Sequence, residues 1–266
     1  MMDSEVEDDD AADSDDTADS DDADDSGDAD DSDNPLAPSS CEEIAALFQT
    51  LGSANPDLPE PFVSATCSDD GGMVTVESNG IPDFPYIATS PGVPTAFDLT
   101  YTFPTVPTVA DTTTAIPIVG AIGVAVNGVP IFGPTEGPGG DVQARPGGFT
   151  ECGGHNGPST YHYHLFLVTG SDRCRFSEAD GRVIYGYALD GYPIYGGYDY
   201  TSSYELTDES LFDSDTWAAH TYVEGLGDLD ECNGLIDENG NYGYYATEGF
   251  PYLLGCFRGE PQFPSM

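Results

Sequence analysis

The chain contains an internal repeat, in which a short segment and a cysteine block each occur twice in the same order. This feature restricts the possible folds more than any other. Residues 125–133 (AVNGVPIFG) match residues 188–196 (ALDGYPIYG), with the same residue at the Ala, Pro, Ile and both Gly positions. An Asn-Gly or Asp-Gly pair between apolar runs is a strong signal for a β-hairpin. The sequence therefore predicts two similar hairpins, one in each half of a two-fold repeat.

A cysteine block follows each predicted hairpin. Residues 151–154 (ECGG) precede residues 161–164 (YHYH) and then Cys174. In the second half, residues 231–234 (ECNG) precede residues 242–245 (YGYY) and then Cys256. We predict repeat one over residues 118–174 and repeat two over residues 181–256, with an insertion in repeat two near residues 198–226.

The even number of cysteines predicts disulfide bonds. A chain rich in Gly, Tyr and Pro with six cysteines is typical of a protein that folds in an oxidising compartment. The repeat pairs Cys152 with Cys174 and Cys232 with Cys256, which leaves Cys41 and Cys67 to tie down the N-terminal segment. A CxxC motif is absent from the sequence, so metal binding by thiolates is the weaker alternative.

The secondary-structure pattern predicts a mainly β fold. From Met73 onward, short runs rich in Val, Thr, Tyr and Ile are separated by Gly pairs and Pro. We expect an antiparallel sandwich or irregular barrel built from the two-fold internal repeat. One short N-terminal helix is expected over residues 41–52, where Ile44, Leu47 and Phe48 have helical spacing and Gly52 is a stop signal.

Charge and composition divide the chain into three parts. We predict an acidic disordered tail over residues 1–38, a helical segment tied to the domain over residues 39–72, and the β domain over residues 73–266. The formal charge is −44, and 18 of the 49 acids lie in residues 1–34, which have few apolar residues to bury. The rest of the chain has 31 acids and only five arginines. Phosphate binding needs clustered basic side chains, so unassisted binding to nucleic acid is excluded.

The acidic surface has two interpretations. It suits a salt-rich habitat, where salt screens the repulsion between carboxylates. Alternatively, the carboxylates collect divalent cations such as calcium, for which residues 228–239 offer Asp228, Asp230, Asp237, Glu238 and Asn239. We expect no membrane-spanning segment. An export signal is not visible at residues 1–4, so any signal or surface anchor would precede residue 1.

Three of the four histidines fall within ten residues and are the candidate metal ligands. In a strand, His162 and His164 project from the same face, while Tyr161 and Tyr163 project from the other. His155, in a glycine-rich loop, could supply a third imidazole, a ligand set that suits copper or zinc. The alternative is a hydrogen-bonded core. Candidates for supporting the site are Tyr161, Tyr163, Glu151 and His220.

Five motifs in this order resemble the YHYH-domain family over roughly residues 73 to 260: GVAVNGVPIFGP, CGGHNGPSTYHYHLFL, YALDGYPIYGG, LDECNG and FPYLLGCFRG. The resemblance implies a bacterial, often secreted or surface-anchored protein of largely uncharacterised function. In the family pattern LDECNG usually continues into a second YHYH, where this chain has YGYY at residues 242–245. A segment around residues 78–84 often carries His where this chain has Phe84.

Three functions remain open at this point. The leading hypothesis is an extracellular or cell-surface metal-binding module that holds copper or zinc at His155, His162 and His164. A second is a metal-dependent enzyme, a hydrolase or oxidoreductase, at the same site. The third is a structural cell-surface module without metal, in which the histidines are core hydrogen-bonders.

Overall fold

The computed structural model describes most of the chain after the acidic tail. By its contacts the chain divides into residues 1–35 and residues 36–266. All of the described residues belong to the second unit, so the tail predicted over residues 1–38 lies outside them. They are residues 40–88, 92–137, 139–144, 149, 152–157, 160–166, 174–176, 182–197 and 199–264.

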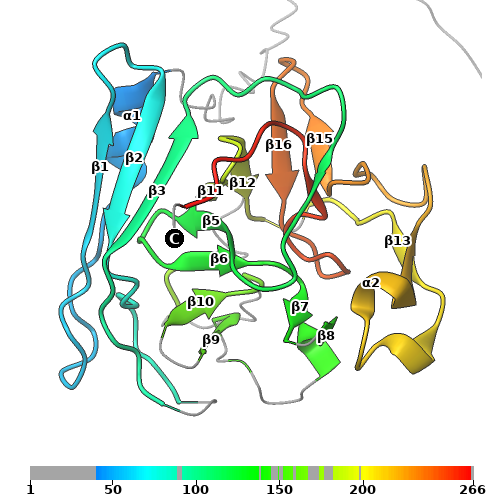
Figure 1. Ribbon diagram of the computed structural model, residues 1–266, viewed down its shortest axis with the longest axis horizontal. Coiled ribbons are helices and arrows are strands. Elements are labelled where there is room, and N and C mark those ends of the chain that lie inside the picture. Colours follow the sequence, from blue (N-terminus) through cyan, green and yellow to red (C-terminus); the bar gives the residue numbers. More distant parts are fainter. Residues whose placement is uncertain are drawn as a thin grey trace, which may run out of the picture. The chain divides into compact units, whose positions relative to one another are not determined.

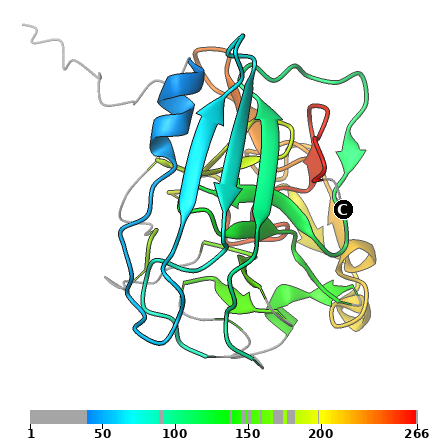
Figure 2. The ribbon, with the colours of Figure 1, turned by 60° about the vertical axis from the view of Figure 1, so that its left-hand side comes forward.

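The N-terminal part forms a helix and a small sheet. Helix α1 (Cys41–Leu47) begins with a capping box in which the side chains of Ser40 and Glu43 each bind the other's backbone N–H. It ends before the predicted stop at Gly52, because the backbone is extended at Phe48 and the next N–H, of Gln49, bonds the carbonyl of Val126. In Figure 2, α1 lies beside an antiparallel sheet of β1 (Val63–Cys67), β2 (Met73–Ser78) and β3 (Leu99–Pro104).

The two repeated segments contribute to one eight-stranded sheet, seen at the centre of Figure 1. Its order is β15-β16-β12-β11-β5-β6-β10-β9. The strands are β5 (Ala121–Ala125), β6 (Pro130–Phe132), β9 (Gly154–Asn156), β10 (Tyr161–Tyr163), β11 (Ile184–Ala188), β12 (Pro193–Tyr195), β15 (Gly234–Ile236) and β16 (Tyr242–Tyr245).

The pairing in this sheet is mixed rather than wholly antiparallel. Both predicted hairpins, β5–β6 and β11–β12, are antiparallel, but β10 pairs parallel to β6 and β16 pairs parallel to β12. A parallel pair needs a long connection between its strands. The chain between β6 and β10 provides it and includes the cysteine block at residues 151–154. The expectation of a purely antiparallel fold is therefore wrong, while the mainly β class is confirmed.

The small sheet packs on the large one through aromatic rings. Phe103 of β3 stacks on Tyr187 of β11 with ring centroids 5.2 Å apart, and Phe48 contacts both rings. All three side chains are buried in the main core. In the part of the chain that is described, the sheets do not close into a barrel.

Short elements complete the unit. Within the predicted insertion lie β13 (Tyr204–Leu206), a 3-10 turn (Glu209–Leu211), α2 (Thr216–Ala219) and β14 (His220–Tyr222). The four-residue α2, capped by Asp215, is too short to show helical periodicity in the sequence, and it was not predicted. Two-stranded pairs are formed by β4 (Thr114–Ala115) with β17 (Cys256–Phe257) and by β7 (Thr135–Glu136) with β8 (Gly140–Asp141). A second 3-10 turn, Val142–Ala144, follows β8.

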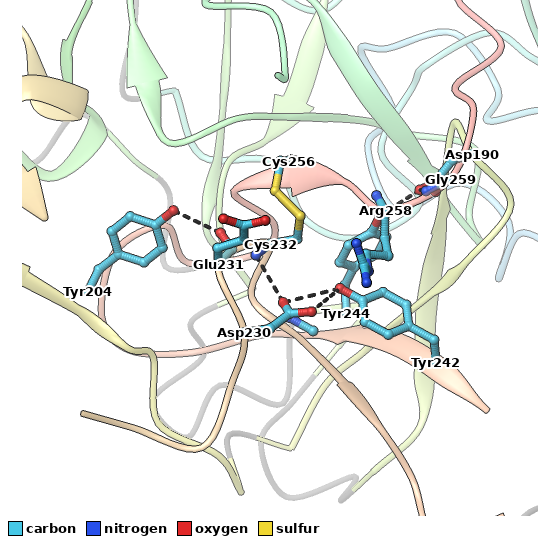
Figure 3. The surroundings of a disulfide bond; sticks show 11 residues. Asp190, Tyr204, Asp230, Glu231, Cys232, Tyr242, Tyr244, Cys256, Arg258 and Gly259 are labelled. Carbon is cyan, nitrogen blue, oxygen red and sulfur yellow. Dashed lines mark hydrogen bonds between the residues drawn. A yellow bond between two sulfur atoms is a disulfide. The ribbon is translucent and has the colours of Figure 1, made fainter. Parts of the chain in front are cut away.

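All six cysteines are paired as predicted: Cys152–Cys174 and Cys232–Cys256 from the repeat, and Cys41–Cys67 as the remaining pair. Figure 3 shows the last of these bonds, where the carbonyl of Glu231 accepts a hydrogen bond from the Tyr204 hydroxyl. Among the described residues there is no helix with the length and apolar character needed to span a bilayer.

Candidate metal centre

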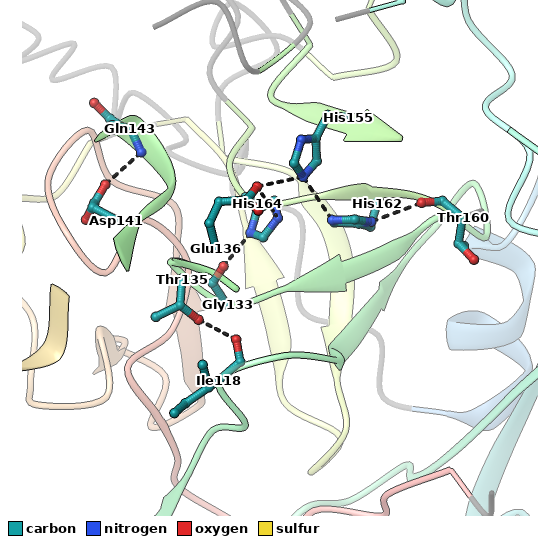
Figure 4. Close-up of polar contacts among 10 residues, drawn as sticks. All are labelled: Ile118, Gly133, Thr135, Glu136, Asp141, Gln143, His155, Thr160, His162 and His164. Carbon is teal, nitrogen blue, oxygen red and sulfur yellow. Dashed lines mark hydrogen bonds and ion pairs between the residues drawn. The ribbon is translucent and has the colours of Figure 1, made fainter. Parts of the chain in front are cut away.

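Strands β9 and β10 bring the three clustered histidines together. They pair antiparallel with His155 directly opposite His162, and His164 follows β10 immediately. Figure 4 shows the three side chains converging beside the end of β7. The prediction that His162 and His164 share a face is confirmed, because their ring centroids lie 4.8 Å apart.

The three rings form a nearly regular triangle. The other two centroid separations are 4.7 Å for His155–His162 and 5.1 Å for His155–His164, and all three pairs are edge-on. The Nε2 atoms of His155 and His162 lie 3.1 Å apart. Each histidine offers a ring nitrogen within 4.8 Å of the others, so the three nitrogens could share one ion.

Backbone carbonyls fix the orientation of two of these rings. Nδ1 of His162 lies 3.1 Å from the carbonyl oxygen of Thr160, and Nδ1 of His164 lies 2.5 Å from that of Gly133. A carbonyl only accepts hydrogen bonds, so both Nδ1 atoms carry the proton and both Nε2 atoms carry the lone pair. Metal-binding histidines are commonly held in this way. The buried Nε2 of His164 makes no hydrogen bond in the structure.

The site favours neutral imidazoles. His162 and His164 are 7% and 2% exposed. Burial, together with a smaller effect of the neighbouring histidines, lowers the pKa of His162 to about 2 and the pKa of His164 to about 4. A neutral imidazole is the form that binds metal, so these two side chains need not lose a proton at ordinary pH before they can act as ligands.

Sequence reasoning missed Glu136, the last residue of β7. Its Oε1 lies 2.8 Å from Nε2 of His155 and 3.7 Å from Nε2 of His164. The only signal in the sequence is its position three residues after Gly133, the end of the first repeated hairpin. Nothing distinguished it from the chain's other acids, because the contact depends on how the β7–β8 pair lies against β10.

Aromatic side chains cover the histidines. The Phe132 ring stacks on His162 with centroids 4.1 Å apart, and Phe149 lies 5.0 Å from His155 and 5.7 Å from His164. These rings reduce the access of water to the cluster, which strengthens electrostatic interactions within it.

None of the four proposed supporting residues is placed beside the three histidines: three lie elsewhere, and Glu151 is outside the described residues. The Tyr163 hydroxyl accepts a hydrogen bond from Asn127 on the opposite face of β10, where the Tyr161 ring also packs. His220 donates from Nδ1 to the Thr216 carbonyl at 2.8 Å and stacks on Phe250. Tyr161 makes ring contacts with Phe84 and Tyr86.

The acidic loop considered for calcium uses its carboxylates internally. Asp237 accepts hydrogen bonds from the backbone of Asn239 and Asn241 and pairs with Arg182 at 3.3 Å. The carboxylates of Asp228 and Asp230 likewise accept backbone hydrogen bonds. A further group, Glu231 with Cys232 and Cys256, offers no thiolate because its sulfurs form a disulfide (Figure 3).

Comparison with known proteins identifies one family. The family model described as YHYH protein matches residues 100–259, more than half of the chain. This region contains the whole eight-stranded sheet, the three histidines and Glu136. No curated protein and no solved structure matches the chain.

Proposed function

The chain belongs to the YHYH protein family, and from that premise we propose that it is an extracellular metal-binding module with copper or zinc at His155, His162 and His164. The observation that carries the proposal is the unsatisfied Nε2 of His164. It is buried, its lone pair is directed by the bond from Nδ1 to Gly133, and it lies in a triangle of imidazoles. An ion would supply the missing partner, and the 3.1 Å between Nε2 of His155 and Nε2 of His162 is short enough for both nitrogens to bind it.

An exported location is supported by the three disulfide bonds. Disulfides persist in oxidising compartments and are rare where thiols are kept reduced. The acidic segment before residue 39 would then serve as a spacer between a surface anchor and the folded unit.

We also infer that the two halves of the eight-stranded sheet are a structural repeat. From the central β5–β11 pair outward, both halves follow the same series of antiparallel, parallel and antiparallel pairings. In the second half, Leu235 lies opposite Gly243 as His155 lies opposite His162 in the first. A half that forms the same strands with Leu and Gly supports a functional rather than a structural role for the histidines.

Metal binding by the full-length chain tests the proposal. We expect one zinc or copper ion per chain by elemental analysis and titration calorimetry. Substituting His162 and His164 by Gln should abolish this binding, because it removes two of three ligands. The matched control is His220→Gln, the histidine outside the cluster, which should bind as the wild type does. The control also accounts for weak cation binding by the acidic tail.

The competing functions predict different results. If the histidines are core hydrogen-bonders, the wild type binds neither ion, and each substitution costs about 1–3 kcal/mol from partners left unsatisfied. That outcome would reject the metal site. A metal-dependent enzyme would bind the ion equally well. The metal-binding module and the enzyme therefore differ in whether the bound ion keeps an open coordination position.

A further inference from the structure

We infer that Glu136 is the fourth protein ligand of the same ion, so that the centre is a closed tetrahedral His3Glu site suited to zinc. The inference rests on the proposed function. It adds how the metal is coordinated, and it assigns the ion a non-catalytic role. Structural zinc sites have four protein ligands, whereas catalytic zinc sites have three and keep one position for water or substrate.

Three of the six ligand-atom separations in the cluster are close to those of a tetrahedron. With metal–ligand bonds of about 2.0–2.1 Å, tetrahedral ligand atoms lie about 3.3 Å from one another. The Nε2 atoms of His155 and His162 are 3.1 Å apart. Oε1 of Glu136 is 2.8 Å from His155 and 3.7 Å from His164. These three separations bracket the expected value.

The ring positions favour a tetrahedral over a square-planar arrangement of the three imidazoles. In a planar site two of the three rings lie opposite each other with centroids about 6 Å apart, whereas tetrahedral ligands bring every pair to about 5 Å. The observed centroid separations are 4.7, 4.8 and 5.1 Å. This arrangement favours zinc over copper(II), which prefers tetragonal geometry.

The β7–β8 hairpin positions the Glu136 carboxylate independently of the histidines. Asp141, which pairs with Thr135 across the hairpin, is fully buried. Its carboxylate accepts hydrogen bonds from Thr216 at 2.6 Å and from the Tyr252 hydroxyl at 2.8 Å. The first bond ties the hairpin to α2 in the insertion, and the second ties it to the segment before β17.

Backbone contacts hold the same hairpin from both sides. The N–H of Asp141 donates to the carbonyl of Phe212, and the N–H of Thr216 donates to the carbonyl of Gly139. The hydroxyl of Thr135 donates to the carbonyl of Ile118 at 2.5 Å. A carboxylate presented by a hairpin fixed at this many points loses little freedom when it binds an ion, which favours its use as a ligand.

Cobalt(II) titration of the full-length protein tests the inference, because cobalt replaces zinc and absorbs visible light strongly when it is four-coordinate. We expect a strong four-coordinate spectrum in the wild type that added azide does not change. In Glu136→Ala an open position should appear, so azide should shift the spectrum. Glu136→Gln provides a second variant of nearly the same size, in case the smaller side chain disturbs the hairpin.

Zinc affinity supplies the second readout. Removing an outer partner of a ligand costs about 10–100-fold in affinity, so loss of a ligand in either Glu136 variant should exceed about 100-fold. The control is Glu205→Gln, which removes the same charge from an exposed position on β13 and should leave affinity and spectrum unchanged.

The outcomes separate this inference from the proposed function. If the wild type binds neither zinc nor cobalt, both are wrong. If the wild type binds zinc but azide shifts its cobalt spectrum, and the Glu136 variants keep their affinity within about tenfold, only the fourth ligand is wrong. Glu136 would then lie beside an open position, as the enzyme hypothesis requires.

Discussion

At the scale of single residues, burial determines the protonation of the two central histidines. Burial lowers the pKa of His162 to about 2 and the pKa of His164 to about 4 from the usual 6.5. In the unfolded chain both would bind a proton as the pH falls below about 6.5. At pH values below about 6.5 but above the pKa values in the folded state, the unfolded state therefore binds more protons than the metal-free folded state. In this range the stability of the folded state falls as the pH falls.

This difference predicts a pH dependence of the metal-free protein. In the presence of a chelator, the free energy of unfolding should fall from about pH 6.5 to about pH 4.5, by up to about 1.4 kcal/mol per pH unit for each of the two histidines. Urea unfolding of the wild type and of the variant with Gln at His162 and His164 checks it, since the variant should show the shallower slope. Equal slopes would mean that neither histidine is held neutral by the fold.

A buried carboxylate in the second half of the eight-stranded sheet predicts that two equivalent tyrosine hydroxyls contribute differently to stability. The carboxylate of Asp190 is fully buried and accepts hydrogen bonds from the Tyr244 hydroxyl at 2.6 Å and from the N–H of Gly259 at 2.9 Å (Figure 3). At the matching position of the first half, Asn127 donates to the Tyr163 hydroxyl at 3.2 Å and also to Asp83. Removal of the Tyr244 hydroxyl deprives a buried carboxylate of a donor, whereas Asn127 keeps a partner when Tyr163 loses its hydroxyl.

We therefore expect Tyr244→Phe to destabilise the protein by about 1.5–3 kcal/mol and Tyr163→Phe by about 0.5–1.5 kcal/mol. The two substitutions remove the same atom from the same type of residue at buried positions, so each is the control for the other. Midpoints of urea unfolding at neutral pH give the comparison. A larger loss in Tyr163→Phe would show that the neutral pair in the first half matters more to stability than the carboxylate.

At the scale of elements, local turn chemistry made the two hairpins predictable. Gly128 and Gly191 have φ of +83° and +90°, a conformation that residues with a side chain rarely adopt. The Asn-Gly and Asp-Gly pairs therefore identify the turns from the sequence alone. The disulfide pairing was predictable for a related reason, because the repeat places each cysteine pair in the same relation to a hairpin.

The remaining elements depend on contacts between distant parts of the chain. The parallel pairing of β10 with β6 rests on a single aligned pair, Tyr163 with Ile131, and nothing local in either strand specifies its partner. The β7–β8 hairpin has two residues in each strand, too few for an alternating pattern. Glu136 was therefore missed as a member of the cluster, although the three histidines were identified.

The Cys152–Cys174 disulfide lies next to β9, and we predict that it helps to hold the histidine cluster in place. Cys152 lies just before β9, and the carbonyl of its neighbour Gly153 accepts hydrogen bonds from the N–H groups of His164 and Leu165. Replacing Cys152 and Cys174 by Ser should cost about 2–5 kcal/mol and should also weaken zinc binding. The matched control is the Cys232–Cys256 bond, which closes a loop of similar sequence separation, 24 against 22 residues.

Loss of the control bond should lower stability by a similar amount but leave zinc affinity unchanged, because it joins the residues just before β15 to β17, and neither strand carries a residue of the histidine cluster. Thermal unfolding and zinc titration of the two double variants give both quantities. If the two variants lose zinc affinity equally, the effect comes from general loosening of the fold, and the specific support of β9 by Cys152 is wrong.

At the scale of the whole molecule, net charge is the dominant feature. A charge of −44 with only five arginines gives the carboxylates few partners, so their mutual repulsion acts against any compact state. The described part contains two Arg–carboxylate pairs, Arg175 with Asp83 and Arg182 with Asp237. Most carboxylates therefore have no arginine partner, and the stability of the fold should depend on the ions around it.

We expect added salt to stabilise the protein. Raising NaCl from about 0.1 to about 1 M shortens the screening length from about 10 to about 3 Å and should raise the thermal midpoint. Thermal unfolding in NaCl and KCl checks it, and the two salts should act alike because screening does not depend on the cation. A variant that begins at residue 39 lacks 18 of the acids but keeps those of the folded unit, and it should still respond to salt.

Calcium separates screening from specific cation binding. If the carboxylates only need screening, CaCl2 should stabilise the protein no more than its ionic strength predicts. A rise in midpoint at millimolar CaCl2 that saturates would indicate a calcium site, since a ligand bound only by the folded state stabilises it according to its concentration and affinity. The internal hydrogen bonds of Asp228, Asp230 and Asp237 favour screening, because their oxygens already have partners. A saturating calcium effect would therefore direct the search to carboxylates outside this loop.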